Sequence, residues 1–130
     1  MTKPVLMFLL CLALAPASYA DEVMDKEIDH LLDTVVASNC TFIRNGKEHD
    51  PEAAKDHLSM KRNRGKKYYS TADEFIDNLA SSSSWSGKPY QIRCGEEQPQ
   101  PAKQWFDAVL AAYRSSQQRP ESDPDFLNLP

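Results

Sequence analysis

The first twenty residues constrain this chain most, because they have the three-part pattern of an export signal. Lys3 supplies a positive charge, an apolar run extends from Val5 to Ala15, and small residues flank Tyr19, as signal peptidase prefers. We predict a signal peptide over residues 1–20 with cleavage before Asp21. The run is too short to span a bilayer as a mature helix, so we expect an exported protein that is not transmembrane once processed.

Export gives the cysteines a structural meaning. Removing the leader leaves two of the three cysteines, Cys40 and Cys94, in the processed chain. Pairing is the default for such cysteines in an oxidising compartment. Because the sequence has no C-x-x-C pattern, we predict a structural disulfide rather than a redox-active one.

Length and charge limit the classes of function. With 130 residues and 41% hydrophobic composition, the chain is too short for a (β/α)₈ barrel or a full dinucleotide-binding fold. We expect one domain over residues 21–118, followed by a tail over 119–130 that is rich in proline and acidic residues and therefore disordered. The formal net charge of −4 disfavours nucleic acid as a partner.

Apolar periodicity and capping residues predict four helices. The first extends over residues 22–38, and the second begins after the cap Asp50 and ends near Gly65. A capping box over residues 71–74 begins the third, in which Glu74 is expected to accept from the cap amide. The cleanest apolar stripe predicts the fourth, with Ala102, Trp105, Phe106, Val109, Leu110 and Tyr113 on one face.

Two short strands are expected, one over residues 40–44 before an Asn45-Gly46 turn and one over residues 90–94. If Cys40 faces Cys94 in an antiparallel pair, Phe42 faces Ile92 and Arg44 faces Tyr90. A parallel or unpaired arrangement stays open. The predicted fold is mainly α, a small four-helix domain with a two-stranded β-ribbon tied by the disulfide.

Several segments together resemble a known family. They are Phe42-Ile43-Arg44-Asn45-Gly46, then His49, Ala53-Ala54, His57-Leu58 and Lys61, then Thr71-Ala72 with Phe75-Ile76, and finally the stretch from Ser81 to Tyr90. This order resembles the YfeK-like family of short, exported, uncharacterised proteins of Gram-negative bacteria, over roughly residues 24–94. The resemblance implies a periplasmic location. It implies no activity, substrate or cofactor.

The disulfide-tied ribbon would bring polar residues of distant segments together. Guanidinium and ammonium groups bind carboxylate or phosphate, hydroxyls bind sugars, and an aromatic face stacks on either. The candidate ligand-binding residues are Arg44, Asn45, His49, His57, Lys61, Ser84, Ser86, Lys88 and Tyr90. The competing interpretation is that Asn45-Gly46 and Ser86-Gly87 only turn the chain, while His57 packs at a helix seam.

A basic run over Lys61–Lys67, beside Tyr68 and Tyr69, favours weak contact with an anionic membrane surface. The simpler interpretation is a solvated connector between two helices. The run therefore adds a possible partner without defining one.

Catalysis and metal binding have little support in the residues. The sequence contains no G-x-S-x-G, H-E-x-x-H or S-x-x-K pattern, although a small hydrolase with a Ser/His site assembled by the fold stays open as an alternative. His49 and His57 with nearby acidic residues do not supply the four converging ligands of a structural zinc site. We expect no metal and no cofactor.

One further alternative is inhibition of a periplasmic lysozyme. The Ser86–Tyr90 segment has an S-G-x-x-Y form that resembles the loop of known lysozyme inhibitors. Our main prediction is a noncatalytic periplasmic binding or accessory module of the cell envelope. Its ligand would be anionic or contain carbohydrate, and its partner an envelope component or periplasmic protein.

Overall fold

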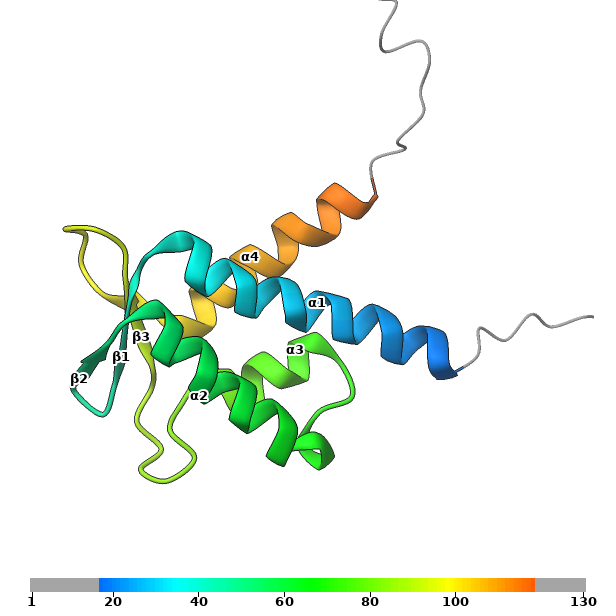
Figure 1. Ribbon diagram of the computed structural model, residues 1–130, viewed down its shortest axis with the longest axis horizontal. Helices are drawn as coiled ribbons and strands as arrows, with labels where there is room; N and C mark the ends of the chain where they lie inside the picture. The colour runs from blue at the N-terminus through cyan, green and yellow to red at the C-terminus, as the bar shows by residue number, and fades with distance from the viewer. Residues whose placement is uncertain (1–16, 119–130) are drawn as a thin grey trace, which may run out of the picture.

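The computed structural model describes residues 17–118. The tail over 119–130 and nearly all of the expected signal peptide lie outside the described residues. Within the described range, four α-helices and a four-stranded antiparallel sheet make up the fold (Figure 1). The mainly helical prediction is therefore confirmed. The sheet has four strands rather than the two that were predicted.

Helix α1, Ala17–Ser38, is the central element of the helical layer. It packs against α2, Pro51–Arg64, on one side and against α4, Ala102–Gln117, on another (Figure 1). Its apolar stripe lies in the core, as the periodicity predicted, with Ile28, Leu31, Leu32 and Val35 buried. The helix ends where Asn39 adopts a positive φ of 54°, a conformation that asparagine tolerates.

The predicted cap of α2 and its end near Gly65 are confirmed. Asp50 accepts a hydrogen bond from the backbone N–H of Ala53 at 2.8 Å, and Pro51 occupies the first turn. Gly65 follows the helix with a negative φ of −103°, so it does not end the helix through a left-handed conformation. A Cβ at Gly65 would lie 2.9 Å from the Leu79 side chain, so glycine is needed for close packing.

The third helix is short and continues in a wider turn. Helix α3, Ala72–Phe75, passes into the π-helical segment Ile76–Ala80, and Phe75, Ile76, Leu79 and Ala80 are buried. Thr71 accepts from the N–H of Glu74 at 3.1 Å. The Glu74 carboxylate accepts from the N–H of Ser70, one residue before the expected cap amide.

The sheet has the strand order β2-β1-β3-β4. Its members are β1, Thr41–Arg44; β2, Lys47–His49; β3, Gln91–Arg93; and β4, Gln100–Pro101. The antiparallel pairing of β1 with β3 and the register Phe42 opposite Ile92 are confirmed. The predicted Cys40–Cys94 disulfide is present at the start of this pair and joins positions with a sequence separation of 54.

The ladder between β1 and β3 ends one step before Arg44 and Tyr90. Its last pair is Ile43 opposite Gln91, because the N–H of Tyr90 bonds instead to the carbonyl oxygen of Ser81 at 2.9 Å. The same register still places Arg44 and Tyr90 next to each other beyond the ladder. The sheet lies at one end of the helices, and the described chain ends at the other (Figure 1).

Candidate functional site

Three elements meet around the side chain of Tyr90. Strand β1 contributes Arg44, helix α2 contributes His57 and Lys61 from adjacent turns, and Tyr90 precedes β3. The tight Asn45-Gly46 turn, with φ values of 52° and 74°, reverses the chain directly after Arg44. The disulfide-tied strand pair and the start of α2 therefore fix these side chains relative to one another.

Lys61 is a buried cation to which residues 17–118 supply no carboxylate partner. Its residue is only 7% exposed, and its ammonium nitrogen Nζ donates to the hydroxyl of Tyr90 and to the carbonyl oxygen of Ser82, both at 3.0 Å. Nζ also lies 4.9 Å from the centre of the Tyr90 ring. Burial, with the nearby Arg44 charge, lowers the pKa of Lys61 to about 8. The hydrogen bonds that the described residues give its charged form therefore come from neutral groups.

His57 lies between Arg44 and Tyr90. Arg44 Nη1 is 3.1 Å from Nδ1 of His57, and the Tyr90 hydroxyl is 3.3 Å from Nε2. Burial, then the charges of Arg44 and Lys61, lower the pKa of His57 from 6.5 to about 4. At neutral pH the ring is uncharged, so one of its nitrogens is free of a proton and accepts from Arg44.

Tyr90 has a supporting role rather than the stacking role expected from the sequence. The residue is 1% exposed, and its ring packs at a centroid distance of 5.2 Å from Phe42 and 6.2 Å from His57. Burial raises the pKa of its hydroxyl, which therefore stays protonated at neutral pH. Its covered ring cannot stack on a ligand, but its hydroxyl positions Lys61 and His57.

The loop over residues 81–90 closes the other side of the site. Ser83 Oγ accepts from the N–H groups of Trp85 and Ser86, and Ser86 donates its hydroxyl proton to Asn45 Oδ1 at 2.5 Å. Gly87 turns the loop with a positive φ of 73°, and Ser82 pairs with Pro89. These bonds join the loop to the Asn45 turn.

A cavity of about 240 Å³ opens between these elements, and we call it the cationic cavity. It is lined by Arg44, Asn45, His57, Met60, Lys61, Ser83, Ser84, Trp85 and Tyr90. No lining residue is acidic, although the chain has 19 acidic residues. Neither Arg44 nor Lys61 has an ion-pair partner among residues 17–118. The cavity therefore presents uncompensated positive charge.

The structure brings most of the predicted site residues together. Arg44, Asn45, His57, Lys61, Ser84 and Tyr90 line the cationic cavity, and Ser86 contacts it through Asn45. His49 lies outside the lining, opposite Phe42 in β2. The Lys88 side chain also does not line it, and this residue contributes backbone hydrogen bonds to the loop.

Sequence reasoning missed Met60, Ser83 and Trp85. Trp85 is 94% exposed at the cavity rim, which makes it the accessible aromatic of the site. Its position among serines in Ser83-Ser84-Trp85-Ser86 was the available signal, because a loop rich in small polar residues cannot bury an indole.

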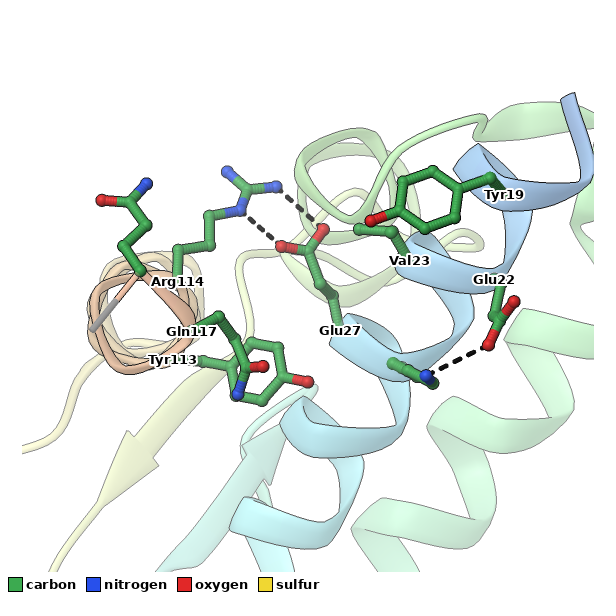
Figure 2. Close-up of a pocket in the computed structure, with 9 residues that line it drawn as sticks. Tyr19, Glu22, Val23, Glu27, Tyr113, Arg114 and Gln117 are labelled. Carbon is green, nitrogen blue, oxygen red and sulfur yellow. Dashed lines mark hydrogen bonds and ion pairs between the residues drawn. The ribbon is translucent and has the colours of Figure 1, made fainter. Parts of the chain in front are cut away.

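A second hollow, of about 380 Å³, lies between α1 and α4 and has a different character. Figure 2 shows the guanidinium of Arg114 pointing to the carboxylate of Glu27, with hydrogen bonds of 2.6 and 3.1 Å. Glu22 likewise pairs with Lys26. Because the charges of this hollow are paired, it has less attraction for an ionic ligand than the cationic cavity.

Within residues 17–118, no group of three or more His, Cys, Asp or Glu side chains is arranged to hold a metal ion. No serine in the described range hydrogen-bonds a histidine, and the partners of His57 are Arg44 and Tyr90. None of the described helices is both long and apolar enough to cross a membrane.

A model of a protein family of unknown function, DUF5329, matches residues 22–114. The chain belongs to the DUF5329 family. The matched range of this DUF5329 protein contains every residue that lines the cationic cavity.

This DUF5329 protein is also similar to the uncharacterized protein YfeK of Salmonella typhimurium, which confirms the resemblance found in the sequence. The two are 50% identical over 50 residues, or 38% of this chain and 42% of the relative. The aligned part thus spans less than half of that relative. No solved structure matches the chain significantly.

Proposed function

We propose that this protein is a noncatalytic periplasmic binding module that holds an anionic group of a cell-envelope component in the cationic cavity. Arg44 and Lys61 supply the charge, and the loop over residues 81–90 supplies hydroxyls and the exposed indole of Trp85. The argument depends on one observation above all, which is the burial of the Lys61 ammonium beside neutral oxygens.

An unpaired buried charge is costly, and proteins normally place a counter-ion beside it. In the part of the chain that the structure describes, the acceptors of Lys61 are the Tyr90 hydroxyl and the Ser82 carbonyl. Nearby Arg44 adds a second positive charge and lowers the pKa of Lys61 further. An anion in the cavity would offset both charges, so the free protein is arranged for a ligand with negative charge.

The geometry favours an oxyanion such as phosphate or carboxylate. Arg44 presents a planar fork of donors, and Lys61 a point charge, which together suit a group with several acceptor oxygens. The volume of about 240 Å³ admits a headgroup or one sugar rather than a whole polymer. Trp85 at the rim offers a face on which a sugar ring attached to the anion can stack.

Export is part of this proposal. The N-terminal pattern is typical of a signal peptide, and the Cys40–Cys94 disulfide is the kind of crosslink that persists in oxidising compartments. Both features support a periplasmic location. The anionic polymers and headgroups of the envelope are then the available ligands.

The test is calorimetric titration with sulfate and inorganic phosphate, followed by sedimentation with isolated sacculi and with lipopolysaccharide. Arg44→Gln and Lys61→Met should each weaken binding about tenfold or more, the loss of one charge-assisted contact. Arg93→Gln is the matched control. It removes the same charge from β3, where Arg93 pairs with Glu48 at 2.6 Å, outside the cavity lining.

The sedimentation arms separate the sources of the anion. If the protein binds free oxyanions and only one of the two envelope probes, sacculi or lipopolysaccharide, that probe contains the ligand. Equal binding by wild type, Arg44→Gln and Lys61→Met across all probes would remove the cationic cavity as the site.

A further inference from the structure

The basic run over Lys61–Lys67 does not act as one patch, because the fold divides it. Lys61 is buried in the cationic cavity. Arg62 contacts Asp29 at 2.6 Å and Asp25 at 3.1 Å on α1, so its charge is neutralised. Arg64, Lys66 and Lys67 are exposed and have no ion-pair partner among residues 17–118. Only these last three are available to a charged partner.

Large apolar side chains are exposed on α2, on the segment after it and on the loop over residues 81–90. Trp85 is 94% exposed, Tyr68 53% and Met60 37%, which makes them prominent exceptions to the burial of such residues. A shallow hollow whose lining includes Met60, Lys61, Arg64, Tyr68 and Ser84 adjoins the cationic cavity and shares Met60, Lys61 and Ser84 with it. The three apolar groups therefore lie along one side of the molecule.

Charge is distributed asymmetrically about α2. None of the residues that line the two adjoining hollows is acidic. The acidic residues of α1 that contact α2, namely Asp25, Asp29 and Asp33, pair with Arg62 and Lys55. In Figure 1, α1 and the loop over residues 81–90 lie on opposite sides of α2. The side that carries Trp85 is thus both apolar and positively charged.

We propose that this side docks the protein on an anionic phospholipid bilayer. The docking face consists of Met60, Arg64, Lys66, Lys67, Tyr68 and Trp85. Indole and phenol rings prefer the interface between water and lipid, and exposed cations beside them are attracted to anionic headgroups. Lys67 Nζ lies 5.0 Å from the centre of the Tyr68 ring, an arrangement in which the cation and the aromatic ring meet the headgroup layer together.

Charge complementarity selects the bilayer as occupant over a second copy of this chain. The chain has a formal net charge of −4, yet the two adjoining hollows on this side have no acidic lining residue and the docking face adds three exposed cations, so the positive charge is local. The inference does not rest on the proposed function, because none of the exposed cations lines the cationic cavity.

The experiment measures partition onto vesicles of phosphatidylcholine alone and of phosphatidylcholine with phosphatidylglycerol, using the protein in the form that cells produce. The wild type should co-sediment with the anionic vesicles only, and should be released by raised salt. The triple variant R64Q/K66Q/K67Q should bind the anionic vesicles at least about tenfold more weakly than the wild type. The control K26Q/K55Q/K103Q makes the same change in net charge at exposed lysines elsewhere and should bind like wild type.

Tryptophan fluorescence tests the apolar half of the proposal. Anionic vesicles should shift the emission of the wild type to shorter wavelength as Trp85 enters the interface. Trp85→Phe retains Trp105, on α4, as its remaining tryptophan and should show no shift. All variants are prepared with the same N-terminal residue. The N-terminal segment therefore cannot cause a difference in vesicle binding between them.

Two results would overturn the proposal. One is equal binding of the two triple variants to anionic vesicles, which would make the position of the cations irrelevant. The other is a dimer in solution that Trp85→Phe abolishes, without vesicle binding, which would assign the docking face to a second copy of the chain. A wild type that binds sulfate but no anionic vesicles would likewise contradict the docking proposal, and it would leave the proposed function intact.

Discussion

The ammonium of Lys61 donates to the hydroxyl of Tyr90 at 3.0 Å from a position that is almost fully enclosed. Replacing this lone buried charge with the similar shape of methionine should change the free energy of unfolding by only about 1 kcal/mol, because lost hydrogen bonds offset relieved desolvation. Chemical denaturation of Lys61→Met measures this. A loss of several kcal/mol would show that Lys61 is needed for the fold rather than for a ligand.

Anion binding should weaken as Lys61 loses its proton. Burial and the charge of Arg44 lower the pKa of Lys61 to about 8, so sulfate affinity should fall roughly tenfold between about pH 7 and about pH 9. Sulfate keeps a constant charge over this range. Lys61→Arg keeps its proton and should show a flat profile, and an equally flat profile for wild type would contradict the assignment.

The fold should lose stability as the solution is acidified through the range in which unfolded histidine takes up a proton. The pKa of His57 falls from 6.5 to about 4 on folding, so between these values the unfolded chain binds more protons and stability decreases with falling pH. In denaturation series between about pH 7 and about pH 5, His57→Gln should have a shallower slope than wild type. A residual slope is expected from His49, whose pKa is also lowered, chiefly by burial.

Breaking the Cys40–Cys94 disulfide should destabilise the protein strongly. The crosslink joins positions with a sequence separation of 54, and the chain-entropy relation then gives about 4 kcal/mol of stabilisation, a large part of the stability of a small domain. The double variant C40S/C94S and the reduced wild type should unfold at similarly lower denaturant concentrations. Free Cys40 or Cys94 thiols in protein purified from cells without reductant would count against both the disulfide and export.

The ion pair between α4 and α1 should contribute more to stability than the other surface pairs. Glu27 is 7% exposed, so Arg114→Ala leaves a nearly buried carboxylate without its partner and should cost about 2 kcal/mol. Lys103→Ala is the control, because its partners Asp77 and Asp107 are half exposed and its loss should cost less than about 1 kcal/mol. Equal effects in thermal denaturation would contradict this ranking.

The sequence predicted the helices and the central strand pair because their signals are local or covalent. Apolar residues at three- and four-residue steps defined α1 and α4, and Asp50 and Thr71 marked two helix starts. The two cysteines then aligned Phe42 with Ile92. Strands β2 and β4 were not predicted, because the residues of Lys47-Glu48-His49 and Gln100-Pro101 have low β-propensity. They form strands through pairing with neighbouring strands.

The residues of the cationic cavity were partly predictable for the same reason. The register of the strand pair placed Arg44 near Tyr90, and the helical period placed His57 beside Lys61. Burial was the missing quantity, because sequence alone does not show that the Tyr90 ring is covered by Phe42 while Trp85 is left in solvent. The exposed ring of the site is therefore that of Trp85 and not that of Tyr90.

The crosslink at Cys40 and the cavity at Arg44 lie at opposite ends of one short strand. Side chains alternate across a strand, so slippage by a single residue would turn Arg44 away from His57 and Tyr90. The disulfide thus fixes a single register between the two strands. Oxidative folding in the cell would then decide whether a molecule has a binding site at all, and not merely how long it survives.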